Sequence, residues 1–251
     1  TRAFYLLKTE IMKIAEPSIE NTCVEAEIYE RLLALDDKHI LELGCGSAQI
    51  TRNIASTGSG RRITALEVDE IAHNKNLQIS DLPNVRFELS GAQQIPLDDG
   101  SVDVAFMFKS LHHVPLELMQ PSMQEIMRVL KPGGHAYISE PVFAGDFNEV
   151  LRLFHDEQKV REAAFATVKS VVDDGLFELV EEIFFNSPMH FENFAEFEEN
   201  TIRATHSEHN LDDELYATVK NRFEQHMSEE GASFLMPIRV DLLRKPLKII
   251  S

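Results

Sequence analysis

The amino-acid sequence predicts an α/β fold with a doubly wound, mostly parallel sheet of seven strands and helical lid insertions. From residue 38 to about residue 140, short aliphatic or β-branched runs alternate with longer segments of helical period, a pattern typical of βα units. Clusters of Gly, Pro, Asn and Asp separate these runs. Two further strand-like runs follow, with helical segments between them, and we expect one domain overall.

The individual elements follow from the period of the apolar residues. The strands expected in the parallel part are 39–43, 63–68, 85–89, 102–108 and 135–140. The helices expected between them are 49–56, 70–78 and 116–130, the last with an apolar stripe that faces the core. Beyond Pro141 we expect a helix at 147–172, a strand at 176–185, helices at 191–203 and 211–228, and a final strand at 233–243.

Charge and composition limit the possible partners. The formal net charge is −18, which opposes the counterion release that drives nucleic-acid binding, so we expect no nucleic-acid partner. The two cysteines, Cys23 and Cys45, are too few for a disulfide framework and favour a reducing, cytoplasmic setting. The sequence contains no run of about 18 apolar residues, and we expect no membrane partner. The oligomeric state is left open.

A glycine loop follows the first expected strand. Gly44 and Gly46 precede a helix, so the backbone can turn tightly and approach a ligand closely. The third glycine of a dinucleotide loop is replaced by Gln49, which weakens a pyrophosphate interpretation. Glu67 ends the second strand, where a carboxylate can accept hydrogen bonds from ribose hydroxyls. The alternative is that the glycines only form a turn and that Glu67 is a solvated strand end.

Five motifs occur in an order and spacing that resemble one protein family. The loop from Glu42 to Ala48 resembles the first motif of class I methyltransferases that use S-adenosylmethionine (SAM), in the small-molecule type 11 group. The other four motifs are 65–69, 95–103, 110–114 and 128–134. The resemblance implies a Rossmann-like fold, SAM as cofactor and S-adenosylhomocysteine as product.

The same resemblance implies roles for individual residues at the cofactor. Gly44, Cys45 and Gly46 would line the methionine and ribose portions of SAM, with Glu42 near its amino end. Glu67 would hold the ribose diol, and Val68 would lie beside the adenine.

The third-strand motif departs from the family pattern. In the family, an acidic residue at the position of Gly91 accepts a hydrogen bond from the adenine amino group. In this chain only backbone groups or the side chains of Ser90 and Gln93 remain to contact the adenine. We therefore expect Gly91, Ala92 and Gln93 at the adenine. Lys109 follows the fourth strand, where it either meets the methionine tail and the substrate or is simply solvated.

Two adjacent histidines are the candidate catalytic residues. His112 and His113 lie in the loop at the carboxyl end of the fourth strand, the edge where open α/β sheets bind ligands. Either can act as the base if the nucleophile carries a proton, or both only cap and pack. Glu140, at the end of the fifth strand, either orients a substrate or caps the next segment.

The region before the last strand offers two interpretations of substrate binding. Residues 170–202 contain nine acidic residues, no Lys or Arg, and several phenylalanines, which suits either a pocket for a cationic or amine-bearing acceptor or an ordinary amphipathic face. His206 and His209 have metal-ligand spacing but lack further ligands nearby, so we expect no metal.

The sequence thus predicts an enzyme that transfers a methyl group from SAM to an O, N or C nucleophile of a small molecule. The alternatives are a SAM-binding protein with non-methyl or no catalytic activity, and an NAD(P)-dependent oxidoreductase. The expected organisation is an N-terminal helical cover (1–35), a SAM-binding core (36–141), a region of helices, a late strand and a lid insertion for the substrate (142–232), and a final strand that completes the sheet (233–251).

Overall fold

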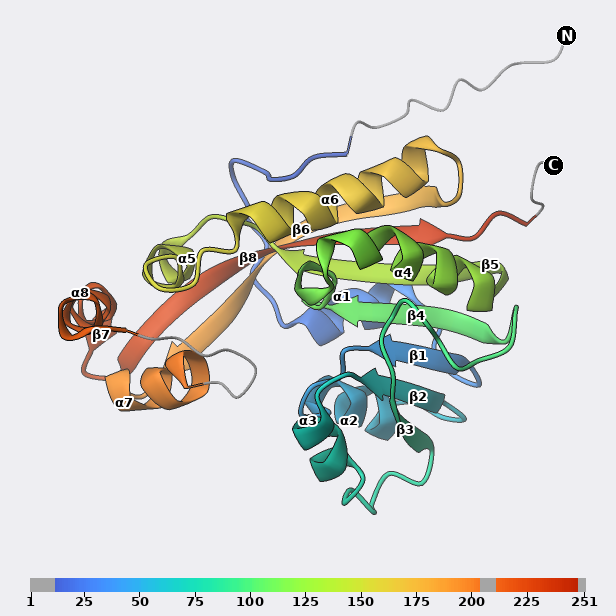
Figure 1. The fold of residues 1–251 in the computed structure, drawn as a ribbon, viewed down its shortest axis with the longest axis horizontal. Helices are drawn as coiled ribbons and strands as arrows, with labels where there is room; N and C mark the ends of the chain where they lie inside the picture. Colours follow the sequence, from blue (N-terminus) through green and yellow to red (C-terminus); the bar gives the residue numbers. More distant parts are fainter. Residues whose placement is uncertain (1–11, 204–210, 248–251) are drawn as a thin grey trace, which may run out of the picture.

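The computed structural model describes residues 12–203 and 211–247. A central sheet has the order β3-β2-β1-β4-β5-β8-β6, and its first five strands are parallel (Figure 1). The doubly wound α/β prediction is confirmed. The parallel strands are β1 (His39–Leu43), β2 (Arg62–Glu67), β3 (Val85–Leu89), β4 (Val102–Phe108) and β5 (Leu130–Pro141).

Helices cover both faces of the parallel strands, and each face has its own apolar cluster. Helices α4 (Leu116–Val129) and α6 (Gln158–Asp173) pack on one face through side chains such as Met123 and Val168. Helices α1 (Glu25–Leu32) and α2 (Gln49–Ser56) pack on the other, where Tyr29 meets the aromatic rings of β4 and β5. Strands buried on both faces need continuous apolar runs, and β4 shows such a run. Helix α3 (Glu70–Asn76) begins at Asp69, whose carboxylate accepts hydrogen bonds from the backbone of the first turn.

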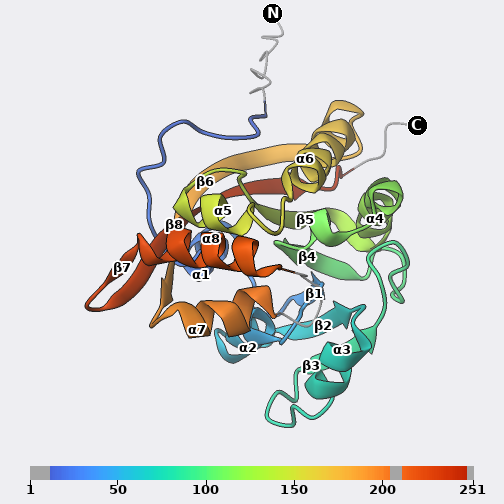
Figure 2. The ribbon, with the colours of Figure 1, turned by 60° about the vertical axis from the view of Figure 1, so that its left-hand side comes forward.

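The late strands form a long antiparallel ribbon. Strands β6 (Glu178–Phe191) and β8 (Gly231–Arg244) pair along most of their length and extend beyond the parallel sheet. Their far end, at the left in Figure 1 and turned forward in Figure 2, carries the helical lid. The lid consists of α7 (Phe194–Phe197), the π-helix η2 (Glu198–Ile202) and α8 (Asp213–Glu224).

Three expectations about these elements need correction. The sheet has eight strands because the short β7 (Met227–Ser228) pairs with β8. The helix expected at 147–172 is divided into α5 (Asp146–Leu151) and α6, since Asp156 accepts a hydrogen bond from the Gln158 amide and starts a new helix. Strand β6 was expected to end at residue 185 but continues to Phe191, where a helix was expected to begin, because β8 offers it a full ladder of partners.

The N-terminal cover is less helical than expected. Among described residues before β1, only α1 is a helix, and residues 12–24 run as irregular chain. Their backbone instead bonds the edge strand β6: the Cys23 amide donates to Asn186 O and the Asn186 amide to Asn21 O. An edge strand leaves backbone groups unpaired, and this segment satisfies some of them.

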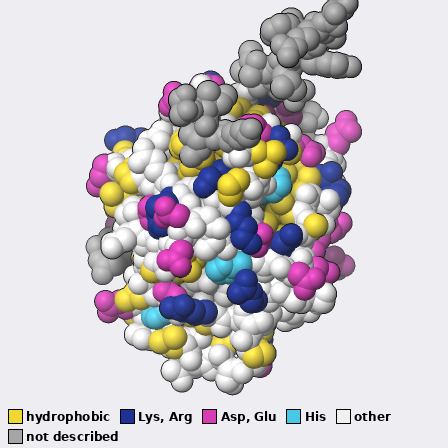
Figure 3. Space-filling view, turned by 90° about the vertical axis from the view of Figure 1, so that its right-hand side faces the viewer, with side chains coloured by type: hydrophobic (Ala, Val, Ile, Leu, Met, Phe, Trp, Pro, Cys, Tyr) yellow, Lys and Arg dark blue, Asp and Glu magenta, His cyan; other side chains and the backbone are white. Residues whose placement is uncertain are grey.

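The surface carries both signs of charge. On the face shown in Figure 3, basic and acidic side chains are interspersed with apolar ones, so the net negative charge does not form one continuous field there. No described helix is long and apolar enough to cross a membrane.

Candidate functional site

The glycine loop turns from β1 into α2 at the carboxyl edge of the sheet. Gly44 has φ +74° and its amide donates to Leu66 O at 2.9 Å; a Cβ there would lie 2.9 Å from the Ser110 Cβ, so the position has no room for a side chain. Gly46 also has a positive φ, of +53°, but a Cβ there would meet nothing within 4 Å. The loop is therefore packed against β4 at its first glycine and borders open space at its second.

Glu67 holds this loop in place. Its Oε2 accepts a hydrogen bond from the Gly46 amide at 2.6 Å, and its Oε1 accepts from the amides of Val68 and Asp69 at 2.8 and 2.9 Å. A carboxylate has about four acceptor positions, so one remains for a ribose hydroxyl. Glu67 thus shapes the loop and retains capacity for one further donor.

Glu42 is a buried carboxyl with an unmet hydrogen-bonding position. Its side chain lies on β1, and its Oε2 has no hydrogen-bond partner among the described residues. Burial raises its pKa to about 7, and the nearby charge of Glu67 adds to the effect. An unpartnered buried oxygen beside a glycine loop fits a bound ammonium group, which would supply both a hydrogen bond and a compensating charge.

The adenine end expected from sequence is apolar and open. Val68, just past β2, is 66% exposed, and Leu89, at the end of β3, is 48% exposed. Ser90 Oγ donates to Gln94 O at 2.7 Å, so its proton is already used. Gly91 has the Gln93 side chain folded close over it, and Ala92 is buried in the core. Backbone groups and the Gln93 amide are what remain to contact an adenine here.

Lys109 pairs with the N-terminal helix. It has φ +52° at the end of β4, and its Nζ lies 2.8 Å from Glu25 Oε2 on α1. Tyr137 contacts the other Glu25 oxygen through its hydroxyl at 3.5 Å. Glu25 was not anticipated from sequence, because 84 residues separate it from Lys109 and no motif connects them. Lys109 fastens the cover helix to the carboxyl edge.

Asn76 is a second residue that sequence analysis missed. It is buried at the end of α3, and its Nδ2 donates to Gly46 O at 2.8 Å. The loop at Gly46 is therefore fixed through its amide by Glu67 and through its carbonyl by Asn76. An asparagine in a helix with polar neighbours gives no local signal of such a contact.

The two candidate histidines have different environments. His112 is buried on the 3-10 turn η1 (Leu111–His113), with Nδ1 bonded to Glu140 and Nε2 3.6 Å from Glu157 Oε1. Burial lowers the pKa of His112, but the charges and hydrogen bonds of Glu140 and Glu157 outweigh it and raise the pKa to about 9. His112 is thus an imidazolium at neutral pH and is not a ready general base. His113 is exposed, with its ring centroid 4.0 Å from that of His112.

Two acidic residues hold His112 from opposite sides. Glu140 Oε1 also accepts from the Leu111 amide at 2.9 Å, and the His112 charge keeps the Glu140 pKa low despite complete burial. Glu157 precedes α6; His112 and Arg161 likewise lower its pKa against the effect of burial. Its Oε2 lies 2.6 Å from an Arg161 nitrogen and its Oε1 3.0 Å from His155 Nε2. Sequence analysis identified Glu140 but not Glu157.

The phenylalanines of residues 170–202 do not line a common pocket. Phe177 packs in the cluster under α4 and α6, and Phe185 packs in the cluster under α1. Phe191, Phe194 and Phe197 form the lid interior with rings from α5, α8 and β8. Their burial agrees with the interpretation as packing faces.

Comparison with known proteins relates the segment that contains the glycine loop to one protein family. A family described as "Methyltransferase domain" matches residues 41–138, which include the loop, Glu67 and both histidines. Residues 41–138 are thus similar to the methyltransferase domain of this family. This match supports SAM as the cofactor.

Curated relatives match part of this chain, and the match covers only part of their own length. The sterol 4-C-methyltransferase strm-1 of Caenorhabditis elegans is 30% identical over 132 residues, covering 50% of this chain and 38% of that protein. The O-methyltransferase rstn1 of Aspergillus nomiae is 32% identical over 136 residues, covering 52% of this chain and 59% of that protein. The chain therefore spans about half the length of these relatives.

Solved structures share the fold over a larger part of the chain. The YcgJ protein of Bacillus subtilis has a TM-score of 0.61 at 15% identity, covering 88% of this chain and 97% of that one. A SAM-dependent methyltransferase of Methanosarcina mazei has a TM-score of 0.55 at 18% identity, with 88% and 98% covered. At such identities the likeness describes the fold alone.

Proposed function

We propose that this protein transfers the methyl group of SAM to a nucleophilic oxygen, nitrogen or carbon of a small molecule. The observation that carries the proposal is the cradle at the end of β1: open space at Gly46 beside the unpartnered, buried Oε2 of Glu42. The relatives, a sterol methyltransferase and an O-methyltransferase, support a small-molecule acceptor.

SAM supplies a methyl carbon already activated by the sulfonium charge, so positioning provides most of the catalysis. The chain's own residues do this positioning. Glu42 receives the amino group, the remaining acceptor position of Glu67 receives a ribose hydroxyl, and Val68 offers an apolar side chain to the adenine. Glu67 and Asn76 keep the loop rigid, so the cradle is preformed.

The acceptor side of the site is assigned to the edge formed by η1 and the end of β5. His112 is buried between two carboxylates, and we assign the exposed His113 to the acceptor side. The lid at the far end of the β6/β8 ribbon belongs to the substrate side, since specificity in such folds resides in segments appended to the shared sheet.

Isotope transfer tests turnover directly. Protein incubated with SAM carrying a trideuterated methyl group and a library of small hydroxyl, amine and thiol compounds is expected to produce S-adenosylhomocysteine and one labelled product class, detected by mass spectrometry. If the chain binds SAM tightly and releases no S-adenosylhomocysteine in excess of an acceptor-free control with any compound or with a metabolite extract, the transferase proposal is overturned in favour of a SAM-binding protein without methyl transfer.

A further inference from the structure

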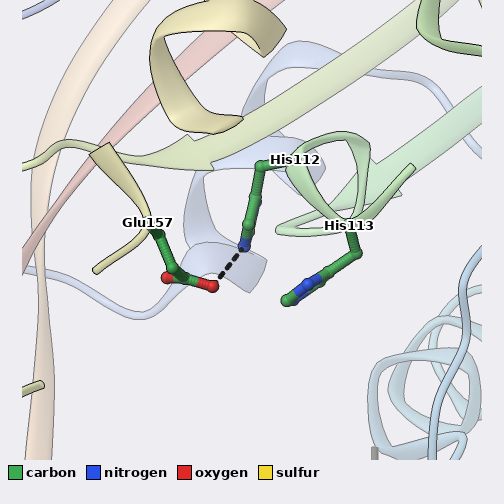
Figure 4. A group of neighbouring side chains, drawn as sticks. All are labelled: His112, His113 and Glu157. Atoms are coloured by element: carbon green, nitrogen blue, oxygen red, sulfur yellow. Dashed lines mark ion pairs between the residues drawn. The ribbon is translucent and has the colours of Figure 1, made fainter. Parts of the chain in front are cut away.

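Imidazole and carboxylate groups from two separate chain segments meet at the acceptor edge. The ring nitrogens of His112 and His113 and the carboxylate oxygens of Glu157 contribute ligand atoms that all lie within 4.8 Å of one another. Figure 4 shows the three side chains converging on one space, with the histidines on η1 and Glu157 on the segment before α6.

We propose that His112, His113 and Glu157 bind a zinc ion whose open coordination position takes the hydroxyl oxygen of the methyl acceptor. The proposal that an ion binds here depends only on the arrangement of these three residues. Its role toward the acceptor rests on the proposed methyltransferase function. The acceptor class is then narrowed to hydroxyl-bearing small molecules.

The donor set suits a catalytic zinc site. Two imidazole nitrogens and one carboxylate oxygen are a known ligand combination of zinc enzymes, in which a water or substrate atom occupies the fourth position. His113 is exposed on the solvent side of the cluster, while His112 and Glu157 are buried, so the fourth position faces outward. Methyl transfer changes no oxidation state, so a redox-inactive ion fits this site better than iron.

Glu140 supplies the outer contact that metal-binding histidines require. A ligating histidine normally donates its other ring N–H to a carboxylate, which fixes the tautomer and the ring orientation. One Glu140 oxygen pairs with His112 Nδ1, and the other accepts a hydrogen bond from the Leu111 amide. This arrangement directs His112 Nε2 toward Glu157.

The local charge also favours a cation. Two buried carboxylates flank the His112 ring, and Arg161 neutralises only the outer oxygen of Glu157, leaving Oε1 toward the histidines. His155 Nε2 lies 3.0 Å from the same Oε1 and would give up this contact on zinc binding. Zinc would bind at His112 Nε2, the ring nitrogen that faces Glu157.

The two proposed histidine ligands of zinc follow directly on a segment that contacts the end of β1, where the glycine loop begins. Ser110, two residues before His112, contacts the glycine loop through its Oγ, which donates to Leu43 O at 2.8 Å. A zinc-bound hydroxyl has a lowered pKa, so its proton leaves to solvent. The oxygen then attacks the methyl carbon, an O–C bond forms, and the C–S bond breaks with its electron pair moving to sulfur. The products are the methyl ether and S-adenosylhomocysteine.

Calorimetric titration of the metal-free chain with zinc chloride tests the ion site. We expect one ion per chain, and His113→Ala and Glu157→Gln should each weaken affinity tenfold or more. His113 is exposed, so its replacement should leave folding intact even if the buried Glu157 variant is unstable. His190→Ala, another exposed histidine, and His206→Ala with His209→Ala, which lie outside the described residues, are matched controls and should bind like the wild type. His155→Ala should not weaken binding.

Cobalt substitution tests the open position. The Co²⁺ form should show the visible absorption of a tetrahedral site, and acetohydroxamate, an oxygen ligand, should shift it. Absence of stoichiometric zinc binding, or wild-type zinc affinity in both His113→Ala and Glu157→Gln, overturns the site; an unshifted cobalt spectrum overturns the acceptor role. SAM binding measured on the same protein separates the two proposals: SAM bound without zinc removes only the zinc site, whereas zinc bound without SAM removes the methyltransferase role.

Discussion

The cofactor half and the lid half of this molecule are built from different kinds of interaction. In the cofactor half, parallel strands β1, β2 and β4 place loop residues at one edge, and specific hydrogen bonds from Glu67 and Asn76 fix them. In the lid, phenylalanine rings from α5, α7, α8 and the β6/β8 ribbon pack on one another. The partly buried Met236 packs against both the lid cluster and the cluster under α1.

Because different interactions hold the two halves together, the sequence of each half can change without the other. A cradle fixed by directional bonds tolerates few changes, because each donor has one acceptor at a set distance. An aromatic cluster tolerates exchange among large apolar side chains, because packing is less directional. The same cofactor half can therefore serve lids of different substrate preference.

The largest expected effect is on the lid. Phe197→Ala removes a fully buried ring at the centre of the lid cluster and should lower its local unfolding free energy by about 3–5 kcal/mol. Hydrogen exchange should accelerate in α8 and not in β1 or β4, and SAM affinity should change by less than about twofold. Phe106→Ala, an equally buried ring in β4, is the matched comparison. It should accelerate hydrogen exchange in the sheet and also weaken SAM binding. Equal loss of SAM affinity in the two variants would show that the halves are coupled.

The next effect concerns the open space at Gly46. Gly46→Leu fills the cradle and should weaken SAM binding roughly 100-fold, or about 2.7 kcal/mol. Gly100→Leu is the control, since Gly100 has φ +61° and also meets nothing within 4 Å, but lies in the turn before β4. Both variants should lose roughly 1–2 kcal/mol of stability from the left-handed backbone, measured by denaturant unfolding. SAM affinity reduced equally in both would place the cofactor elsewhere.

Glu42 should make SAM binding pH-dependent. Its pKa is raised to about 7, so the carboxyl gains its charge, and its attraction for an ammonium group, as pH rises through 7. SAM affinity should increase roughly fivefold to tenfold between about pH 6 and 7.5, and Glu42→Gln should flatten this increase. The free chain shows the opposite trend: a raised acid pKa means the folded state holds the proton more tightly, so this group lowers stability as pH rises from 4.5 to about 7. An unchanged slope in the variant would assign the pH dependence to another group.

The smallest effect concerns the second support of the loop. Asn76→Ala removes the hydrogen bond to Gly46 O and should cost about 1–2 kcal/mol of stability and a few-fold in SAM affinity. Asn84→Ala loses comparable bonds to Ala55 O and Arg61 O, away from the cradle. The stability of Asn84→Ala should fall by a similar amount, while its SAM affinity, measured by calorimetry, stays at the wild-type value. If Asn84→Ala loses SAM affinity as much as Asn76→Ala does, loss of loop rigidity is not the cause of the weaker binding.

Most of the cofactor half was predictable because its signals are local. Gly44, Gly46 and Glu67 stand at fixed distances after two apolar runs, and the strands and turns around them have clear residue preferences. The contacts that complete the site join distant positions. Lys109 meets Glu25 across 84 residues, and three elements (α4, β5 and α5) separate His112 from Glu157 in the sequence. Residues 12–24 and the division of α5 from α6 depend on tertiary partners in the same way.

Titration of SAM into the unmodified chain by calorimetry tests the central claim most directly, with S-adenosylhomocysteine, NAD and NADP titrated in parallel. We expect SAM and S-adenosylhomocysteine to bind with one site per chain and the dinucleotides to give no saturable heat, because the cradle lacks the third glycine and has Gln49 in its place. Saturable binding of a dinucleotide without binding of either adenosyl ligand would contradict the account.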